Sequence, residues 1–314
     1  MKAQINILLF SVLLLYSSLV TSNDNDLTKS ITLDYENRLK AIFEDFHAHP
    51  ELSLAEFETA KKISTALKNH GFTVTENVGG TGVVALLKNG KGPLVMMRAD
   101  MDGLPLEEKT DLPYASKDKQ LDPVTGNVFP VMHACGHDVH ITALIGTAKQ
   151  MVDLKSEWSG TLMLIAQPAE ERVLGARNMM NDNLWERFGK PDYALAFHVS
   201  SMLPSGIVNV VDGSPYAGAD TVDIYVHGIG AHGASPHAGK DPIVLGSQIV
   251  NSLQTLVSRE LPPRQPGVVT VGAFHSGTKH NIISDMAHLQ LTVRNTNDKT
   301  RDTLLSGIKR ISEN

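Results

Sequence analysis

Residues 133–140, with the sequence HACGHDVH, carry three histidines, one thiol and one carboxylate. Imidazole nitrogen and thiolate sulfur are the ligands that zinc-like ions prefer, and a carboxylate can orient a neighbouring imidazole. We expect Cys135 and His137, two residues apart, to face the same side, with Asp138 orienting an imidazole. The alternative is a solvated loop with incidental histidines.

Three further groups are weaker when taken singly. Asp100 and Asp102 are two residues apart, so on extended backbone both carboxylates can approach one cation, although Asp-x-Asp is also an ordinary turn. Glu170 and Glu171 are adjacent, so one can bind metal while the other handles a proton, although surface Glu-Glu pairs are common. A single histidine at a strand end, such as His198, is usually structural.

These groups become stronger candidates for one site because of the segments that precede them. Each follows directly on a strand-like run, such as residues 94–99, 160–167 and 194–197. In open α/β sheets, ligands collect outside the carboxyl ends of the strands. We therefore expect the four groups to lie together at one edge of a sheet.

The surrounding pattern predicts an α/β domain over residues 23–212. Strands alternate with helices in an order typical of a mainly parallel sheet with helices on both faces. After Asp212 the order of expected strands and helices changes, and residues 213–314 are predicted to form a smaller α+β domain. The expected strands are 73–75, 82–87, 93–99, 160–167 and 195–199, then 221–226, 268–275 and 287–294. Two helices are expected within 30–71, separated by residues 49–51, and further helices at 140–154, 242–260 and from 299.

Composition narrows the class of partner. The 314 residues are 42% hydrophobic and 20% charged, which suits one large core or two domains. The formal net charge is −6, and no run of five like charges occurs. The sequence therefore predicts no basic surface that would attract nucleic acid or an anionic membrane, so we expect a small-molecule ligand.

The first 22 residues have the pattern of a secretory signal peptide: Lys2, a short apolar stretch, and small residues ending at Ser22. An uncleaved anchor is the alternative, but the apolar stretch is shorter than the ~20 residues of a spanning helix. We expect an exported protein, periplasmic or secreted, without stable membrane insertion after cleavage. The single cysteine, Cys135, excludes an intrachain disulfide, so it is either buried and inert or a ligand.

Four strings together resemble one family of metallohydrolases. RADMDGLP at residues 98–105, HACGHD at 133–138, QPAEE at 167–171 and FHV at 197–199 are similar to the aminoacylase and metallo-carboxypeptidase family. The nearest branch is that of hippurate hydrolases, N-acyl-amino-acid amidohydrolases and plant auxin-conjugate hydrolases. The resemblance runs from about Leu39 to the last residue, and the HACGHD and PAEE strings in this order are highly specific.

The resemblance implies two divalent metal ions per subunit, which could be zinc, manganese, cobalt or nickel. It makes Glu170 the general base and acid. Asp102 would orient a ligand, and Asp100 stands where related branches have a histidine, so its role is less defined. The implied metal ligands are Cys135, His137, Glu171 and His198.

The smaller domain resembles the family's ferredoxin-like lid and dimerisation domain. Residues 230–237, GAHGASPH, match a string whose first histidine reaches the partner subunit's active site, so His232 would stabilise an oxyanion in a homodimer. Asn281 and Arg294 match positions associated with the substrate carboxylate, which an arginine fork suits. The family usually has proline where Ile283 or Ser284 falls.

The implied reaction is cleavage of the amide bond of N-acyl amino acids. Two metal ions would lower the pKa of a bridging water to about 7, and Glu170 would remove its proton. A dipeptidase, carboxypeptidase or N-acetyl-diamino-acid deacetylase of the same family is the enzymatic alternative. The second alternative is an inactive fragment that only binds metal, although metal binding alone does not require Glu170.

The family's catalytic domain resumes after the lid and supplies a further histidine ligand. This sequence ends at Asn314, inside an expected lid helix, so the resemblance implies a C-terminally truncated chain. We then expect an uncovered sheet edge, poor stability and little activity.

Overall fold

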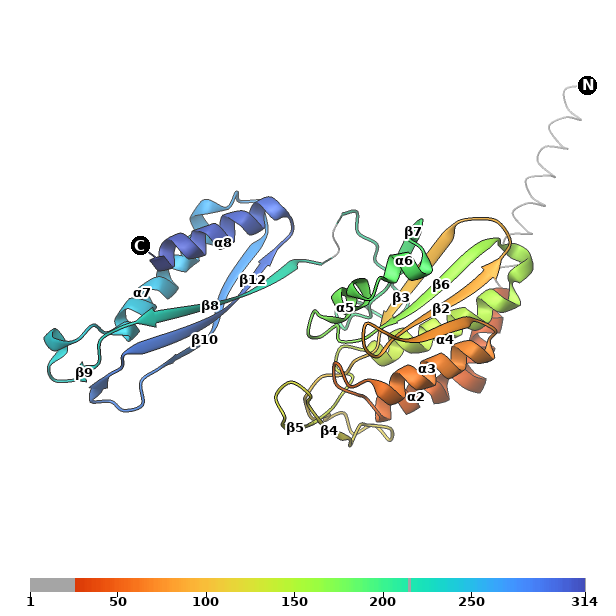
Figure 1. Ribbon diagram of the computed structural model, residues 1–314, viewed down its shortest axis with the longest axis horizontal. Coiled ribbons are helices and arrows are strands. Elements are labelled where there is room, and N and C mark those ends of the chain that lie inside the picture. The colour runs from red at the N-terminus through yellow and green to blue at the C-terminus, as the bar shows by residue number, and fades with distance from the viewer. Residues whose placement is uncertain (1–25, 214–215, 314) are drawn as a thin grey trace, which may run out of the picture. The chain divides into compact units, whose positions relative to one another are not determined.

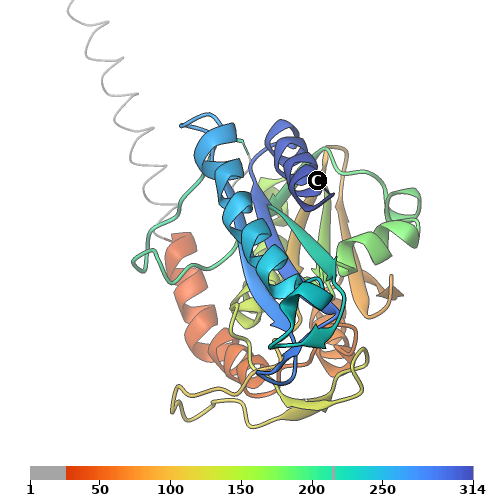
Figure 2. The ribbon, with the colours of Figure 1, turned by 90° about the vertical axis from the view of Figure 1, so that its left-hand side faces the viewer.

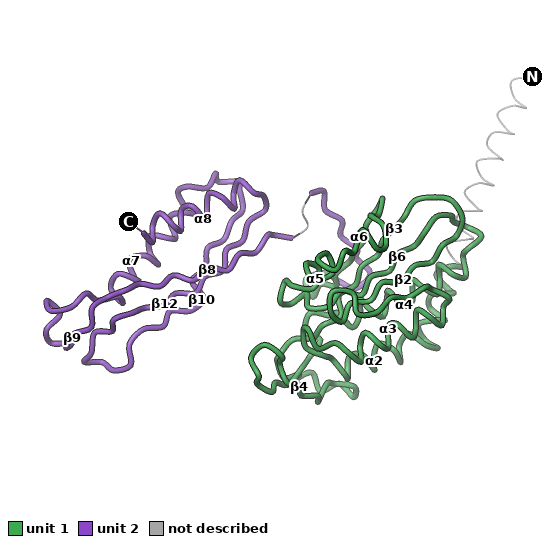
Figure 3. Tube along the Cα trace, in the orientation of Figure 1, with its two compact units in different colours: residues 1–203 green, residues 204–314 purple. Residues whose placement is uncertain are grey.

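The structure is a computed structural model, and it describes residues 26–213 and 216–313. The expected signal peptide lies outside the described residues. The chain divides into two compact units, residues 1–203 and 204–314 (Figure 3). The predicted boundary after residue 212 falls in the segment between β7 (Tyr193–Ala196) and β8 (Gly218–His227). Within the described ranges, no helix is both long and apolar enough to cross a membrane.

Unit 1 is built on a five-stranded sheet (Figure 1). β3 pairs in parallel with β6 and β7, whereas β2 is antiparallel to both β1 and β6. β2 is reversed because only residues 79–81 join it to β1, and a connection this short forces antiparallel pairing. The predicted α/β class is confirmed, with one strand running against the others. The strand order is β1 (Thr73–Val78), β2 (Gly82–Asn89), β6 (Gly160–Gln167), β3 (Leu94–Asp100), β7.

Helices cover both faces of this sheet. Leu162 and Leu164 of β6 pack into one core with α3 and α4, whereas Met163 between them packs into a second core with α5 and α6. Because alternate residues of a strand point to opposite faces, burial on both sides explains the continuously apolar run of β6. The helices are α2 (Lys40–Ala48), α3 (Phe57–Asn69) and α4 (His137–Asp153) on one face, and α5 (Gly175–Asn181) and α6 (Leu184–Phe188) on the other.

The edge strand β7 differs from the rest of the sheet. Its side chains are exposed, with Tyr193 at 65% and Leu195 at 61%. It ends at Ala196, earlier than predicted, so His198 lies beyond the strand. The shorter elements of unit 1 are η1 (Tyr35–Leu39), β4 (Lys119–Leu121), β5 (Val128–Pro130) and η2 (Lys155–Glu157).

Unit 2 is the predicted α+β domain. Its antiparallel sheet has the order β10-β12-β8, and α7 and α8 lie against it (Figure 2). Along β12, Leu289 and Leu291 are buried with Leu253 of α7 and Leu304 of α8, while the residues between them face away from this core. The elements are β8, β9 (Ala231–His232), η3 (Pro236–Ala238), α7 (Pro242–Thr255), η4 (Leu256–Glu260), β10 (Gly267–Ser276), β11 (Ile282–Ile283), β12 (Met286–Asn295) and α8 (Asp298–Glu313).

Candidate metal centre

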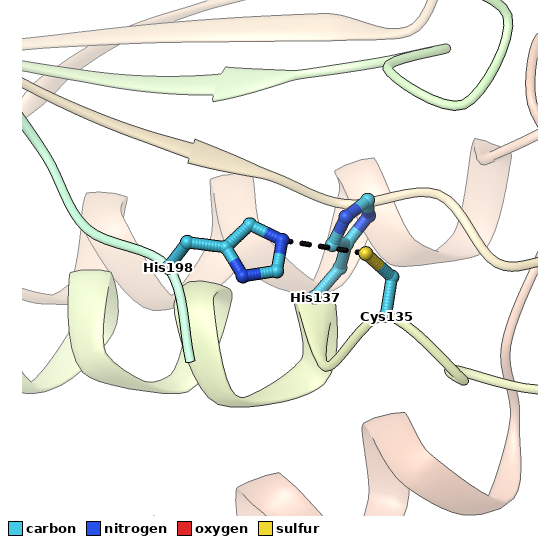
Figure 4. Close-up of side chains that lie close together, drawn as sticks. All are labelled: Cys135, His137 and His198. Atoms are coloured by element: carbon cyan, nitrogen blue, oxygen red, sulfur yellow. Dashed lines mark hydrogen bonds between the residues drawn. The ribbon is translucent and has the colours of Figure 1, made fainter. Parts of the chain in front are cut away.

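Three potential ligands from two segments of the chain meet at one edge of the unit 1 sheet. β3, β6 and β7 are parallel, so the residues that follow them emerge at the same edge. Cys135 precedes α4, His137 begins it, and His198 follows β7 (Figure 4). The Sγ atom of Cys135 lies 3.3 Å from Nε2 of His198, and one donor atom from each of the three residues lies within 4.8 Å of the others.

Glycine at position 136 permits this approach. Gly136 has φ of 81°, in the left-handed region, and a Cβ there would lie 2.4 Å from Cγ2 of Val199. Any side chain would therefore push the Cys135 loop away from the segment that carries His198.

Two further groups share His137. One contains Glu170 and Glu171, whose carboxylate oxygens each lie 3.9 Å from Nε2 of His137. The other contains Asp100 and His140. All five residues that the sequence singled out as ligands or base therefore lie together. Glu170, Glu171 and His198 follow strands of the five-stranded sheet, as predicted, whereas the segment of Cys135 and His137 follows β5, which pairs with β4 in a separate two-stranded sheet.

The ring orientations of His137 and His198 suit metal binding. Nδ1 of His137 is 2.8 Å from the carbonyl oxygen of Asp102, and Nδ1 of His198 is 2.6 Å from that of Val199. A carbonyl only accepts, so each Nδ1 donates and the neutral ring keeps its lone pair on Nε2. Nε2 of His137 is buried and has no hydrogen-bond partner.

The charge of the site also fits a cation. Oε1 of Glu171 is buried without a partner, and burial together with the charge of Glu170 raises the pKa of Glu171. Burial and the neighbouring Glu171 raise the pKa of the Cys135 thiol to about 12. Because a divalent ion would offset this accumulated negative charge and use the unpartnered atoms, the residues fit the expected metal.

Asp102, predicted to orient a ligand, contacts both His137 and the turn that carries Glu170 and Glu171. Its side chain accepts hydrogen bonds from Ser53 Oγ at 2.5 Å and from the backbone N–H groups of Glu170 and Glu171 at 3.1 Å. Burial alone would raise the pKa of Asp102, but the bonds with His137 and Ser53 outweigh it and lower the pKa. Asp102 therefore ties the His137 ring to the Glu170–Glu171 turn.

Asp100 has a less direct relation to the ligands. Its carboxylate bonds Nδ1 of His140 at 2.5 Å and Arg98 at 2.6 Å, and lies 3.7 Å from Nε2 of His137. Nε2 of His140 accepts from the backbone N–H of Val199 at 3.0 Å, so both ring nitrogens are engaged. His140, to which the sequence assigned no role, thus anchors the segment beside His198.

Asp138 orients an imidazole, but not one of the expected ligands. Its carboxylate lies 2.6 Å from Nδ1 of His47, whose Nε2 lies 2.9 Å from Glu108. His47, Ser53 and the buried Glu56 were all missed. Their partners are distant in the chain, and nothing in the local pattern marks them.

Unit 2 brings two of its three predicted residues together. His232 on β9 is exposed, and β9 pairs with β11 so that Gly233 donates to the carbonyl of Asn281 at 2.8 Å. Oδ1 of Asn281 is buried without a partner. Arg294 is exposed near the far end of β12, which at ~3.3 Å per residue is about 26 Å from Met286.

Comparisons with known proteins identify the family of the chain. Residues 96–296 match the model of peptidase family M20/M25/M40. The chain is 39% identical over 270 residues to hippurate hydrolase of Campylobacter jejuni, covering 86% of this chain and 67% of that protein. It is 38% identical over 287 residues to thermostable carboxypeptidase 1 of Saccharolobus solfataricus, covering 90% and 70%.

A solved structure supports the metal-binding character of the fold. A dinuclear metal-binding peptidase of the M20 family from Bacillus subtilis superposes with a TM-score of 0.71 and 33% identity, covering 89% of this chain and 69% of that one. The family model and both relatives indicate the same family. The chain belongs to peptidase family M20/M25/M40 and is a metal-dependent hydrolase of amide bonds.

Proposed function

We propose that the protein removes the acyl group from N-acyl amino acids. The observation that carries this is the buried, unpartnered Nε2 of His137, with Cys135, His198 and a carboxylate pair around it. Cys135, His137, Glu171 and His198 would hold the metal ions. There, a divalent ion would supply the chemistry of activating a water and polarising the substrate carbonyl.

Glu170 is the proposed general base and acid. Its side chain is 40% exposed, so it can meet both a water and a substrate, whereas the Glu171 side chain is 20% exposed. Glu170 takes a proton from the attacking water and returns it to the departing amine nitrogen. Asp102 keeps the pair in place through the backbone N–H groups of both residues.

The lid residues support a homodimer as the working form. His232 would stabilise the developing oxyanion, while Asn281 and Arg294 would bind the substrate carboxylate. Within one lid, the ~26 Å between Arg294 and Met286, at the other end of β12, exceeds the length of a small N-acyl amino acid. A homodimer in which two chains contribute different lid residues to one site resolves this separation.

Substrate choice separates the proposal from its enzymatic alternative. One relative is named for hippurate, an N-acyl amino acid, and another is named a carboxypeptidase. Release of free amino acid should be measured after the purified chain is incubated with zinc, manganese, cobalt or nickel and with hippurate, N-acetyl amino acids, N-acetyl-diamino acids or dipeptides. The proposal expects the fastest turnover with a monocarboxylic N-acyl amino acid; faster dipeptide cleavage would support the peptidase.

The role of Glu170 has its own test. Glu170→Gln should lower kcat about 10²–10⁴-fold while bound metal is unchanged, because the amide cannot carry the proton. Glu186→Gln, an exposed carboxylate on α6, is the matched control and should match the parent chain. Substantial turnover by Glu170→Gln would refute the assignment, and metal binding without turnover by the parent would favour a non-catalytic protein.

A further inference from the structure

The turn that carries Glu170 and Glu171 is held in an unfavourable backbone conformation. Ala169 and Val173 have φ of 45° and 54°, in the left-handed region that residues with a Cβ disfavour. The turn is tight, because Leu174 and Gly175 both donate to the carbonyl of Ala169, at 3.2 and 3.1 Å. Such a conformation persists only where surrounding contacts determine it.

Glu56 supplies one of those contacts from a distant part of the chain. Its Oε1 accepts from the backbone N–H of Ala169 at 2.7 Å, and its Oε2 accepts from Oγ1 of Thr81 at 2.6 Å. Glu56 is 0% exposed. A fully buried carboxylate is costly unless its oxygens are bonded, so its presence needs a reason.

Helix capping does not provide that reason. Glu56 occupies the N-cap position of α3, but its side chain makes no capping hydrogen bond. Glu51 instead accepts from the first-turn N–H groups of Glu58 and Thr59, at 3.2 and 2.7 Å. The carboxylate of Glu56 therefore serves the turn after β6 and not its own helix.

Two buried carboxylates thus hold three successive N–H groups. Glu56 holds that of Ala169, and Asp102 holds those of Glu170 and Glu171. We propose that Glu56 is a positioning residue, which sets the backbone of Ala169 so that Glu170 and Glu171 point at the reacting groups. This inference rests on the proposed function, because it gives those two side chains their roles.

Losing the Glu56 contact would leave the N–H of Ala169 buried and unpartnered, and would free the turn to relax. A displacement of about 1 Å in a catalytic group can cost ~10²-fold in rate. Glutamine at position 56 keeps both contacts, because its oxygen can accept from Ala169 while its amide donates to the Thr81 hydroxyl. Burial raises the pKa of Glu56, against the bonds from Thr81 and Ala169, so a neutral side chain is tolerable there.

The test compares Glu56→Ala, Glu56→Gln and the control Glu51→Ala, a capping carboxylate from the same segment. For Glu56→Ala we expect kcat on hippurate to fall about 10–100-fold with KM within about 3-fold. Zinc affinity of the metal-free chain, measured by competition with a chromophoric chelator, should fall about 10-fold because Glu171 shares the turn. Glu56→Gln should recover most of both losses, and Glu51→Ala should lose only thermal stability.

Three outcomes would overturn the proposal: Glu56→Ala close to the parent in both measurements, Glu51→Ala matching Glu56→Ala, or Glu56→Gln as impaired as Glu56→Ala. If Glu56→Ala does not fold, Thr81→Val and Thr81→Ser decide instead. The valine should weaken zinc binding and the serine should restore it, and equal binding by the two contradicts the proposal. If the parent hydrolyses no N-acyl amino acid, the proposed function fails, while the zinc measurement still decides the role of Glu56.

Discussion

The candidate functional residues of unit 1 include buried side chains fixed by hydrogen bonds, whereas those of unit 2 are mostly exposed. In unit 1, the side chains of Asp102 and His137 are 0% exposed, and hydrogen bonds from several elements fix their orientation. In unit 2, His232 and Arg294 are exposed and lie in different sheets, His232 on β9 of the two-stranded sheet and Arg294 near the end of β12 in the three-stranded sheet. The first arrangement is organised within one chain, whereas the roles proposed for the second would require a substrate or a second chain to give its residues a common target.

The largest contrast should appear in metal binding. His137→Ala removes a shared donor, so zinc affinity should fall by more than the roughly 100-fold typical of an outer-shell partner. His232→Ala should leave zinc affinity unchanged. Chelator competition measures both, and a loss of affinity in His232→Ala would show that the lid also holds metal.

The second largest effect is expected on the free energy of unfolding, which should respond separately in the two units. Leu164 and Leu253 are each 0% exposed, in the cores of unit 1 and unit 2. Truncation of either to alanine should cost about 2–5 kcal/mol through lost burial and a residual cavity. Calorimetry should show each substitution acting on its own unit's unfolding transition; a single transition lowered equally by both would mean that the units unfold together.

A smaller effect is expected at Arg294. Arg294→Ala should raise KM for an N-acyl amino acid about 10-fold, since a charged fork on a carboxylate is lost, with little change in zinc affinity. Arg294→Lys should recover part of it. Arg264→Ala, an exposed arginine of the same unit, controls for the loss of charge, and an equal rise in KM there would remove the specific role of Arg294.

The smallest effect concerns pH. Burial lowers the pKa of His47, but the bonds to Glu108 and Asp138 outweigh it and raise the pKa above 6.5. Its contribution to stability is therefore full below pH 6.5 and is lost as pH rises through the raised value. The melting temperature of the metal-free parent should fall across that window more than that of His47→Gln; parallel profiles would contradict the coupling.

The sequence predicted what depends on strand ends and periodicity. Glu170 and His198 meet because β6 and β7, which precede them, both run parallel to β3, and β12 alternates clearly enough to be recognised. It could not predict contacts set by tertiary packing. Glu56 reaches Ala169 across 113 residues and His47 reaches Asp138 across 91, so no local pattern connects them.

The reversed direction of β2 also could not be predicted from the composition of the strand. β2 is as apolar as a parallel strand because both of its faces are buried, and direction leaves no mark on composition. The short turn at Gly79 and Gly80 was the available signal for a hairpin.

Cys135 gives the chain a reporter group of its own. It is the only cysteine, so alkylation or cobalt–thiolate absorption would report on one known atom. Burial and Glu171 raise its pKa, and only the thiolate attacks oxidants and alkylating reagents. The same burial and carboxylate charge thus hold Cys135 in the thiol form, in which it reacts slowly with oxidants and alkylating reagents.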